Sequence, residues 1–253
     1  ISPDSFFDGG KYIKPKAAID YAAKLLSEGV DILDIGGESS RPGAVPVPYE
    51  EERRRVLPVL KEILKFNVPV SVDTYKPSLM KEVLEEGASM INDIYGFRMP
   101  GALRTVSEFN AGICIMHMQN FPRIMQNSPR YENVLQEVVS FFRKQTEAAK
   151  SLGISSERIV LDPGFGFGKS YQDNLKIFRN LDKFRALSYP ILVGVSRKSF
   201  LGQITGQAVK NREFASVAAA LAAVQKGVAI LRIHDVQATK DVLSVFAELS
   251  KWG

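Results

Sequence analysis

Residues 68–94 read VPVSVDTYKPSLMKEVLEEGASMINDI. It opens with an apolar run rich in valine, 68–73, and closes with a second short apolar run, 90–94. Runs of this kind predict buried β-strands. Between them, residues 77–86 repeat apolar side chains at the spacing of an amphipathic helix. A strand, a helix and a second strand in this order predict one βα repeat of a parallel sheet.

The same alternation continues outward to both ends of the chain. Further strands are expected at 31–36, 112–118, 158–163, 190–196 and 229–234. Further helices are expected near 15–28, 50–65, 101–109, 131–151, 173–183, 212–226 and 236–250. About eight helices therefore follow about seven strands, which is typical of an α/β protein built from βα repeats.

This pattern predicts a (β/α)8 TIM barrel. The chain begins at Ile1 without a methionine, and its first expected helix has no complete strand before it, so we expect the first strand of the barrel upstream of this sequence. An open doubly wound sheet is the alternative, but no early Gly-x-Gly-x-x-Gly turn follows a strand. Because no linker or shift in composition divides residues 1–253, we expect a single domain.

Composition excludes several classes of function. The formal net charge is +5, but basic residues are interleaved with acidic ones, as in the run 51–55, so nucleic-acid binding has little support. No apolar stretch reaches the roughly 18 residues that span a bilayer, so we expect no membrane partner. The single cysteine, Cys114, lies in an apolar run, which suits a reducing cytoplasm.

Polar residues gather where the expected strands end, which is where barrels carry their working groups. Four polar side chains would be costly to bury together without a polar ligand. They are the carboxylates of Asp73 and Asp162, the amide of Asn92 and the ammonium of Lys198. A nitrogen heterocycle would satisfy them. Each carboxylate also has a structural interpretation: Asp162 could cap the following loop, and Asp73 could simply end a strand.

The last expected strand carries Arg232 and His234 on one face, which predicts an anion site. His117 points away from Met116 on its strand and is interpreted as structural. The run ending at Gly168 is not a phosphate-binding P-loop, since Pro163 stands where that pattern needs glycine. No cysteine and histidine cluster has the spacing of a zinc site.

With these segments in order, the chain resembles the dihydropteroate synthase family along nearly its whole length. The motifs that carry the resemblance are 3–10, PDSFFDGG; 37–43, GESSRPG; 71–74, SVDT; 92–93, ND; 116–119, MHMQ; 162–167, DPGFGF; 196–199, SRKS; and 232–236, RIHDV. Ser2 and Ser40 stand where this family commonly has threonine.

The resemblance implies that p-aminobenzoate attacks the cationic methylene left when 6-hydroxymethyl-7,8-dihydropterin diphosphate loses diphosphate, giving 7,8-dihydropteroate for folate biosynthesis. It implies Mg²⁺ as cofactor, held by an asparagine upstream of Ile1 and by no protein ligand in this chain. It also implies a homodimer, and sulfonamides as inhibitors that compete with p-aminobenzoate. A pterin-dependent methyltransferase with a corrinoid partner is one alternative, which the motif 196–199 and the motifs 3–10 and 37–43 disfavour. A catalytically silent pterin-binding paralogue is the other, which the intact residues Arg41, Lys198 and Ser199 disfavour.

Residue roles follow from the same resemblance. Catalytic residues would be Lys198, Asp73 and Asp162, with Asp8 as a further contributor. The pterin would be bound by Asp73, Asn92, Met116, Asp162, Phe167, Gly194 and Lys198. The diphosphate would be bound by Ser39, Arg41, Arg232 and His234. The p-aminobenzoate pocket would be formed by Phe6, Ser40, Arg41, Pro42, Lys198 and Ser199.

Overall fold

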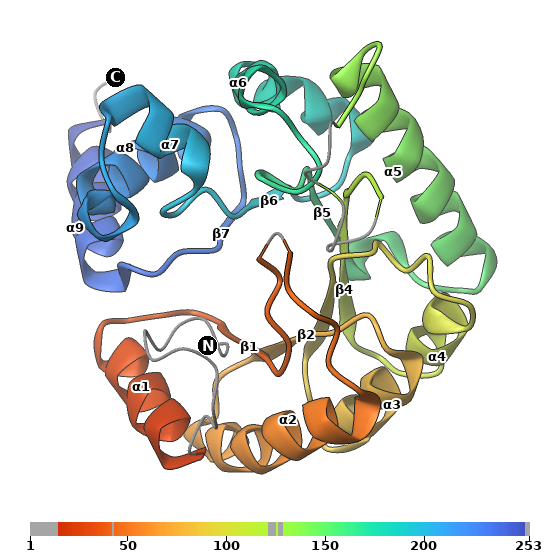
Figure 1. The fold of residues 1–253 in the computed structure, drawn as a ribbon. Helices are drawn as coiled ribbons and strands as arrows, with labels where there is room; N and C mark the ends of the chain where they lie inside the picture. Colours follow the sequence, from red (N-terminus) through yellow and green to blue (C-terminus); the bar gives the residue numbers. More distant parts are fainter. Residues whose placement is uncertain (1–14, 42, 121–124, 126–128, 251–253) are drawn as a thin grey trace.

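The computed structural model describes residues 15–41, 43–120, 125 and 129–250. In this part of the chain short strands alternate with helices (Figure 1). The strands are β1 (Leu33–Gly36), β2 (Val70–Asp73), β3 (Met90–Asp93), β4 (Gly112–Met116), β5 (Ile159–Asp162), β6 (Leu192–Val193) and β7 (Ile230–Leu231). The helices are α1 (Pro15–Ser27), α2 (Tyr49–Ile63), α3 (Pro77–Glu85), α4 (Ala102–Ser107), α5 (Val134–Ser151), α6 (Tyr171–Arg179), α7 (Ser199–Thr205), α8 (Glu213–Gln225) and α9 (Val236–Leu249).

All pairings between these strands are parallel. One ladder runs β1-β2-β3-β4-β5 and a second joins β6 to β7, with a bridge between Leu161 and Ile191 connecting the two. The strands lie inside a ring of helices that runs from α1 round to α9 (Figure 1). Parallel strands inside and helices outside confirm the expected α/β fold class.

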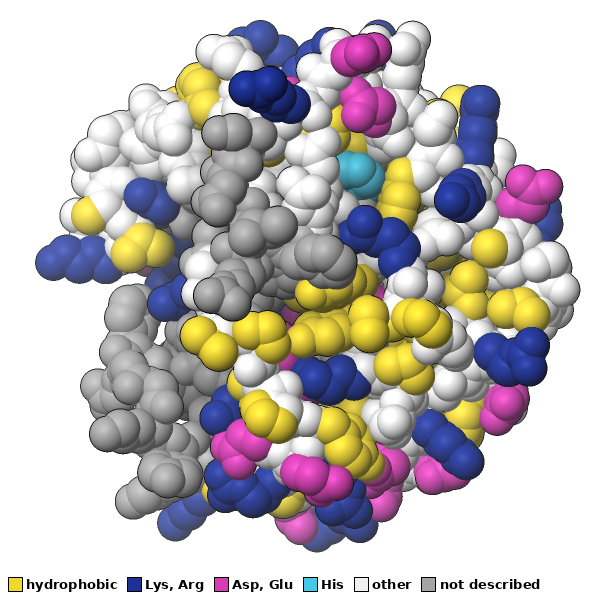
Figure 2. Space-filling view, turned by 45° about the vertical axis from the view of Figure 1, so that its right-hand side comes forward, with side chains coloured by type: hydrophobic (Ala, Val, Ile, Leu, Met, Phe, Trp, Pro, Cys, Tyr) yellow, Lys and Arg dark blue, Asp and Glu magenta, His cyan; other side chains and the backbone are white. Residues whose placement is uncertain are grey.

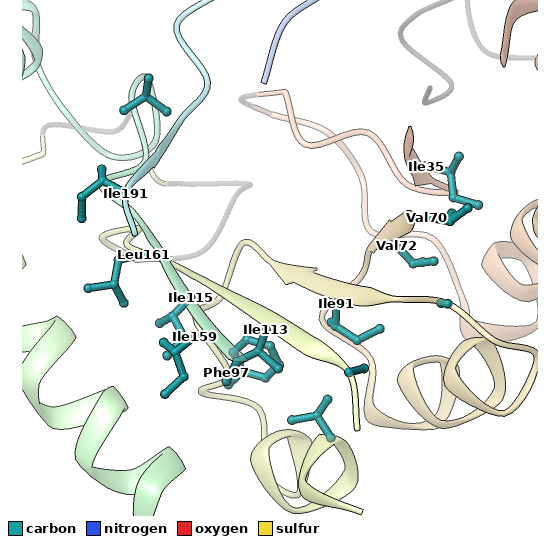
Figure 3. Close-up of a cluster of buried hydrophobic side chains, with 14 of the residues drawn as sticks. Ile35, Val70, Val72, Ile91, Phe97, Ile113, Ile115, Ile159, Leu161 and Ile191 are labelled. Carbon is teal, nitrogen blue, oxygen red and sulfur yellow. The ribbon is translucent and has the colours of Figure 1, made fainter. Parts of the chain in front are cut away.

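The register separates an apolar face from a polar face of the sheet. Ile35 pairs with Val72, which pairs with Ile91, which pairs with Ile113, so these side chains point the same way. They pack between the strands and the helices (Figure 3). Because side chains alternate along a strand, the residues between them point into the barrel. This alternation is what sends the polar residues to the interior.

Two details differ from the sequence expectation. The strands are shorter than predicted, most clearly β6, which covers Leu192–Val193 where 190–196 was expected. The sequence reading also missed α7, which has only seven residues and contains a glycine, the kind of segment that propensity disfavours. At Gly202 a Cβ atom would lie 2.3 Å from the guanidinium of Arg212, so a larger residue there would require this side chain to move.

The surface is mixed in charge. On the face shown in Figure 2, Lys and Arg side chains are interspersed with Asp and Glu at the rim, and a band of hydrophobic side chains crosses the centre. Of the helices in the described part of the chain, none is both long and apolar enough to cross a membrane.

Candidate functional site

The parallel register brings the polar strand ends together at one end of the barrel. Asp73 on β2 is paired directly with Asn92 on β3, and Met116 on β4 is paired with Asp162 on β5. All four point inward by the alternation described above. Asn92 and Asp162 are each only 3% exposed, so these two side chains are almost fully removed from solvent. Four of the side chains that the resemblance assigns to the pterin therefore share one enclosed position.

Asn92 has an acceptor that the described protein does not satisfy. Its Oδ1 is buried and has no hydrogen-bond partner among the described residues. A buried amide oxygen left in this way costs on the order of 1–3 kcal/mol. It faces a cluster where a ligand carrying an N–H donor would remove that cost.

Asp162 has a partner of its own. The backbone N–H of Gly164 donates to its Oδ1 over 2.7 Å, so the loop-capping interpretation of Asp162 holds. Burial raises the pKa of Asp162, while this hydrogen bond and the nearby charge of Lys198 oppose the rise. Capping one oxygen does not exclude binding by a carboxylate, which has about four acceptor sites.

Arg232 follows β7 and forms the electrostatic centre of the site. Its guanidinium lies 2.6 Å from Asp34 Oδ2 and 2.7 Å from Asp73 Oδ2, so one cation bridges carboxylates on β1 and β2. Burial raises the pKa of Asp73 to about 6, against the opposing charge of Arg232, and Asp34 adds to the rise. Burial disfavours the charged form of Arg232, but Asp34 and Asp73 more than offset this and hold its pKa above the usual value.

Lys198 approaches the same cluster from the loop before α7. Its Nζ lies 4.4 Å from the ring centroid of Phe167, over the face of the ring. Burial and then the charge of Arg232 lower the pKa of Lys198 to about 8, against the attraction of Asp162. At Gly194 a Cβ atom would meet nothing nearer than Arg232 at 3.8 Å, so no contact with the described protein requires this glycine.

His234 behaves differently from the cation suggested by its place beside Arg232. Its Nδ1 lies 2.9 Å from Ser196 Oγ, and the residue is exposed. Partial desolvation of the ring and then the charge of Arg197 lower the pKa of His234, so the imidazole is neutral at neutral pH. It can act on an anion as a hydrogen-bond donor and not as a charge.

The loop after β1 holds Ser39, Ser40 and Arg41, where the N–H of Arg41 donates to Ser39 Oγ over 3.3 Å. Glu38, at the start of this loop, accepts hydrogen bonds from Lys76 Nζ at 2.6 Å and from the N–H of Val47 at 3.0 Å. These hydrogen bonds hold the start of the loop in place. Ser199 is exposed at the start of α7. Phe6, Asp8 and Pro42 lie outside the described residues, so their assignments stay predictions.

Three site features were not assigned a role from the sequence. Asp34 lies on the inward face of β1 together with Gly36, which pairs with Asp73. The alternation of side chains along the strand, from Asp34 to Gly36, could have indicated this position. The clamp that Glu38 and Lys76 form has no short-range signal, because 38 positions separate the two residues. Lys169 is buried behind the site and appeared in the sequence only as part of a rejected P-loop pattern.

Magnesium was tested against the donors present. No group of three or more histidine, cysteine, aspartate or glutamate side chains able to hold a metal occurs within the described residues. Asp34 and Asp73, the nearest carboxylates to the anion site, are already bridged by Arg232. The described side chains therefore do not form a magnesium cage.

Comparison with known proteins agrees with this geometry. The family model described as pterin binding enzyme matches residues 1–234. Dihydropteroate synthase of Haemophilus influenzae is 46% identical over 247 residues, which cover 97% of this chain and 90% of that protein.

Solved structures give the same result. The structure of Xanthomonas albilineans dihydropteroate synthase with 4-aminobenzoic acid is 43% identical, has a TM-score of 0.92 and matches 100% of this chain and 91% of that one. The Yersinia pestis enzyme, solved with a sulfonamide drug, is 38% identical with a TM-score of 0.94 and matches 100% and 92% of the two chains. The fold, the polar cluster and these similarities together show that the chain belongs to the pterin-binding enzymes and, among them, to the dihydropteroate synthase family.

Proposed function

We propose that this protein condenses 6-hydroxymethyl-7,8-dihydropterin diphosphate with p-aminobenzoate, giving 7,8-dihydropteroate and diphosphate. The observation that carries the proposal is the buried Oδ1 of Asn92, which has no partner within the described residues and lies beside the carboxylate of Asp73. A pterin edge has amino and ring N–H donors that would satisfy both. Membership of the dihydropteroate synthase family supports the same assignment.

The charges of the site suit the bond changes of the reaction. The bond between the pterin methylene and the diphosphate oxygen breaks, a bond from methylene to the amine nitrogen forms, and the amine proton leaves to solvent. Positive charge that develops on the pterin lies near Asp73 and Asp162, and negative charge that develops on the leaving group lies near Arg232. No side-chain nucleophile is needed.

Magnesium belongs to this proposal as an ion that arrives with the substrate. Mg²⁺ commonly keeps few protein ligands and binds through substrate phosphates, and the described side chains offer no cage for it. We place the diphosphate against Arg232, with His234 as a neutral donor and Ser39 and Arg41 from the loop after β1. Chelation of magnesium is expected to abolish turnover without unfolding the protein.

The second substrate is placed by analogy with relatives. The Xanthomonas albilineans enzyme was solved with 4-aminobenzoic acid and, separately, with 7,8-dihydropteroate, and the Yersinia pestis enzyme with a sulfonamide drug. We propose that p-aminobenzoate and sulfonamides share one pocket here, formed by Phe6, Ser40, Arg41, Pro42, Lys198 and Ser199. Sulfonamides should then compete with p-aminobenzoate.

A homodimer in the cytoplasm is the last part of the proposal. Large apolar side chains are exposed along the segment from α7 to α8: Phe214 is 86% exposed, Ile204 54% and Val209 47%. Where exposed apolar groups form one contiguous patch they mark interaction surfaces, and we propose this segment as the dimer interface. Cys114 is a buried free thiol, which suits a reducing compartment.

The test is diphosphate release by the purified protein with magnesium, with both substrates and with each omitted in turn. Release that requires both substrates is expected. Methyl transfer from a methylated pterin without diphosphate release would indicate the methyltransferase, and pterin binding without any turnover would indicate a silent paralogue; either result would contradict the proposal.

A further inference from the structure

Lys169, in the loop that connects β5 to α6, is a buried lysine with an unusual set of partners. The residue is 3% exposed, and its Nζ lies 3.0 Å from His117 Nδ1, 3.2 Å from the carbonyl of His117, and 3.0 Å from each of the carbonyls of Gly164 and Phe167. Three N–H groups thus serve four acceptors, and none of these acceptors is a carboxylate. Burying an ammonium is costly, so these hydrogen bonds must offset much of that cost.

These hydrogen bonds fix the loop that connects β5 to α6. Both Gly164 and Phe167, three residues apart in this loop, accept from Lys169, while the N–H of Phe167 donates to the carbonyl of Gly164 over 3.1 Å. The loop also lies directly against the end of β4: Gly164 has a φ of +70°, and a Cβ atom there would stand 2.0 Å from the carbonyl oxygen of His117. Lys169 therefore ties the loop and the end of β4 to one point.

The same loop leads to the reacting groups. It follows Asp162, whose Oδ1 accepts from Gly164, and it carries Phe167, whose ring lies under Lys198 Nζ at 4.4 Å. Gly166 brings the loop backbone close to Lys198 as well, since a Cβ atom there would lie 3.3 Å from Lys198 Cδ. A shift of the loop would therefore move the ring beneath Lys198.

We infer that Lys169 is a positioning residue for the pterin site: by holding the β5–α6 loop against β4, it fixes the Phe167 ring beneath Lys198. The inference rests on the proposed function for the identity of the ligand. Burial lowers the pKa of Lys169 to about 7, against the attraction of Asp162 and Asp173. Among the described residues, its hydrogen bonds go to His117 and to backbone carbonyls. Lys169 itself does not touch the substrates in this scheme.

The matched control is Arg158, at the opposite end of β5. It is also a cation that binds backbone carbonyls, through Nε to Ala111 at 2.7 Å and through a terminal nitrogen to Val106 at 3.1 Å. Both Lys169→Met and Arg158→Met should lower the stability of the fold. Only Lys169→Met should weaken pterin binding, by at least about tenfold, the factor that corresponds to about 1.4 kcal/mol.

A double-mutant cycle separates positioning from general destabilisation. If Lys169 acts through Phe167, Lys169→Met should have much less effect on pterin affinity in a Phe167→Ala background than in the wild type. Hydrogen exchange of the amides of 164–168 gives a readout that needs no ligand: exchange there should be faster in Lys169→Met and unchanged in Arg158→Met. If Lys169→Met does not fold, Lys169→Gln, which keeps two donors, is measured in its place.

A folded variant with wild-type pterin affinity, or an effect of the same size with and without Phe167, would overturn the inference. Wild-type protein that neither binds pterin nor turns over would instead refute the proposed function. The exchange of the amides of 164–168 would still decide whether Lys169 holds the loop.

Discussion

Lys198 carries its positive charge in a buried position beside Arg232, and both conditions disfavour the protonated form. Burial and Arg232 lower its pKa to about 8, so it is mostly protonated at pH 7 and loses its proton as pH rises through 8. We expect kcat/KM for the pterin to fall above about pH 8. Lys198→Arg should have lower activity but lack this fall, since a guanidinium stays protonated.

Removing the ammonium should affect turnover far more than stability. Lys198→Ala is expected to lower turnover roughly 10- to 150-fold, the effect of losing a charged hydrogen bond of about 1.5 to 3 kcal/mol. The control is Lys65→Ala, which removes a lysine paired with Glu62 on the surface and should leave the rate unchanged. Near-normal turnover by a folded Lys198→Ala variant would rule out this role.

Arg232 is expected to serve both halves of the substrate. Arg232→Met leaves Asp34 and Asp73 facing one another without their shared cation, so the pKa of Asp73 should rise further. Calorimetry should then show weaker binding of a pterin without phosphates as well as of diphosphate, and stability should fall by about 1 to 3 kcal/mol. Adding Asp34→Asn should restore part of the pterin affinity, because it removes the repulsion. A pterin affinity unchanged by Arg232→Met would contradict the coupling.

Much of the residue-level site could be predicted from the sequence, because parallel strands bring their carboxyl ends to one edge. Asp73, Asn92 and Asp162 were found in this way and do lie together. Asp34 was not, since its role depends on an ion pair with Arg232 across nearly the whole chain, and no local pattern encodes such a contact. The neutral state of His234 likewise follows from desolvation and Arg197, which only the folded arrangement shows.

At the level of elements, the loop after β1 depends on the clamp at its base. Lys76 Nζ binds both Glu38 and Glu52, whose side chains are 10% and 1% exposed, and Tyr75 donates to Glu38 over 2.9 Å. The loop between Glu38 and α2 is the one that we place on the diphosphate. Holding its first residue lowers the entropy that the ligand must remove when it orders the rest.

Lys76→Met should leave both glutamates buried without their cation and lower the free energy of unfolding by about 3 kcal/mol. Burial raises the pKa of Glu52 in the folded protein above its value in the unfolded chain, so ionisation of Glu52 opposes folding. This cost is absent below the unfolded pKa and grows as pH rises from the unfolded pKa through the folded pKa. The deficit of the variant should therefore be larger at pH 7.5 than at pH 4.5. Lys61→Met, which breaks the exposed pair with Glu86, is the control and should cost under about 1 kcal/mol at either pH. Equal deficits at the two pH values would refute the explanation.

Elements with strong periodicity were predicted well, and weak ones were not. The strand and helix order from α1 to α6 follows from alternating valine and isoleucine runs and amphipathic stretches. The α7 segment is short and contains Gly202, which lies close to the guanidinium of Arg212. Tertiary contacts override propensity in such segments, so sequence periodicity cannot reveal them.

At the scale of the whole molecule, the ion pair of Arg232 with Asp34 joins the last described strand region to the first. The hydrogen-bonded ladders run from β1 to β5 and from β6 to β7, and this ion pair links the ends of β7 and β1 at the mouth of the barrel. The cation that we propose for the diphosphate is thus also part of what holds the mouth together. Ligand binding and stability should therefore be coupled.

The assembly prediction concerns the apolar surface on α7 and α8. Phe214→Glu should shift the protein from dimer to monomer in sedimentation velocity, because a charge in a buried apolar interface is costly. Leu152→Glu, at an exposed apolar position after α5, should leave the dimer intact. A Phe214→Glu variant that sediments as wild type would place the interface elsewhere or remove it.

The most direct test of the central claim is conversion of labelled p-aminobenzoate by the purified wild-type protein. With pterin diphosphate and magnesium, the account predicts that the label appears in 7,8-dihydropteroate, one equivalent for each diphosphate released. The Lys198→Ala variant, measured beside it, should form the same product at a much lower rate. Wild-type protein that binds the pterin but leaves the label in p-aminobenzoate would contradict the account.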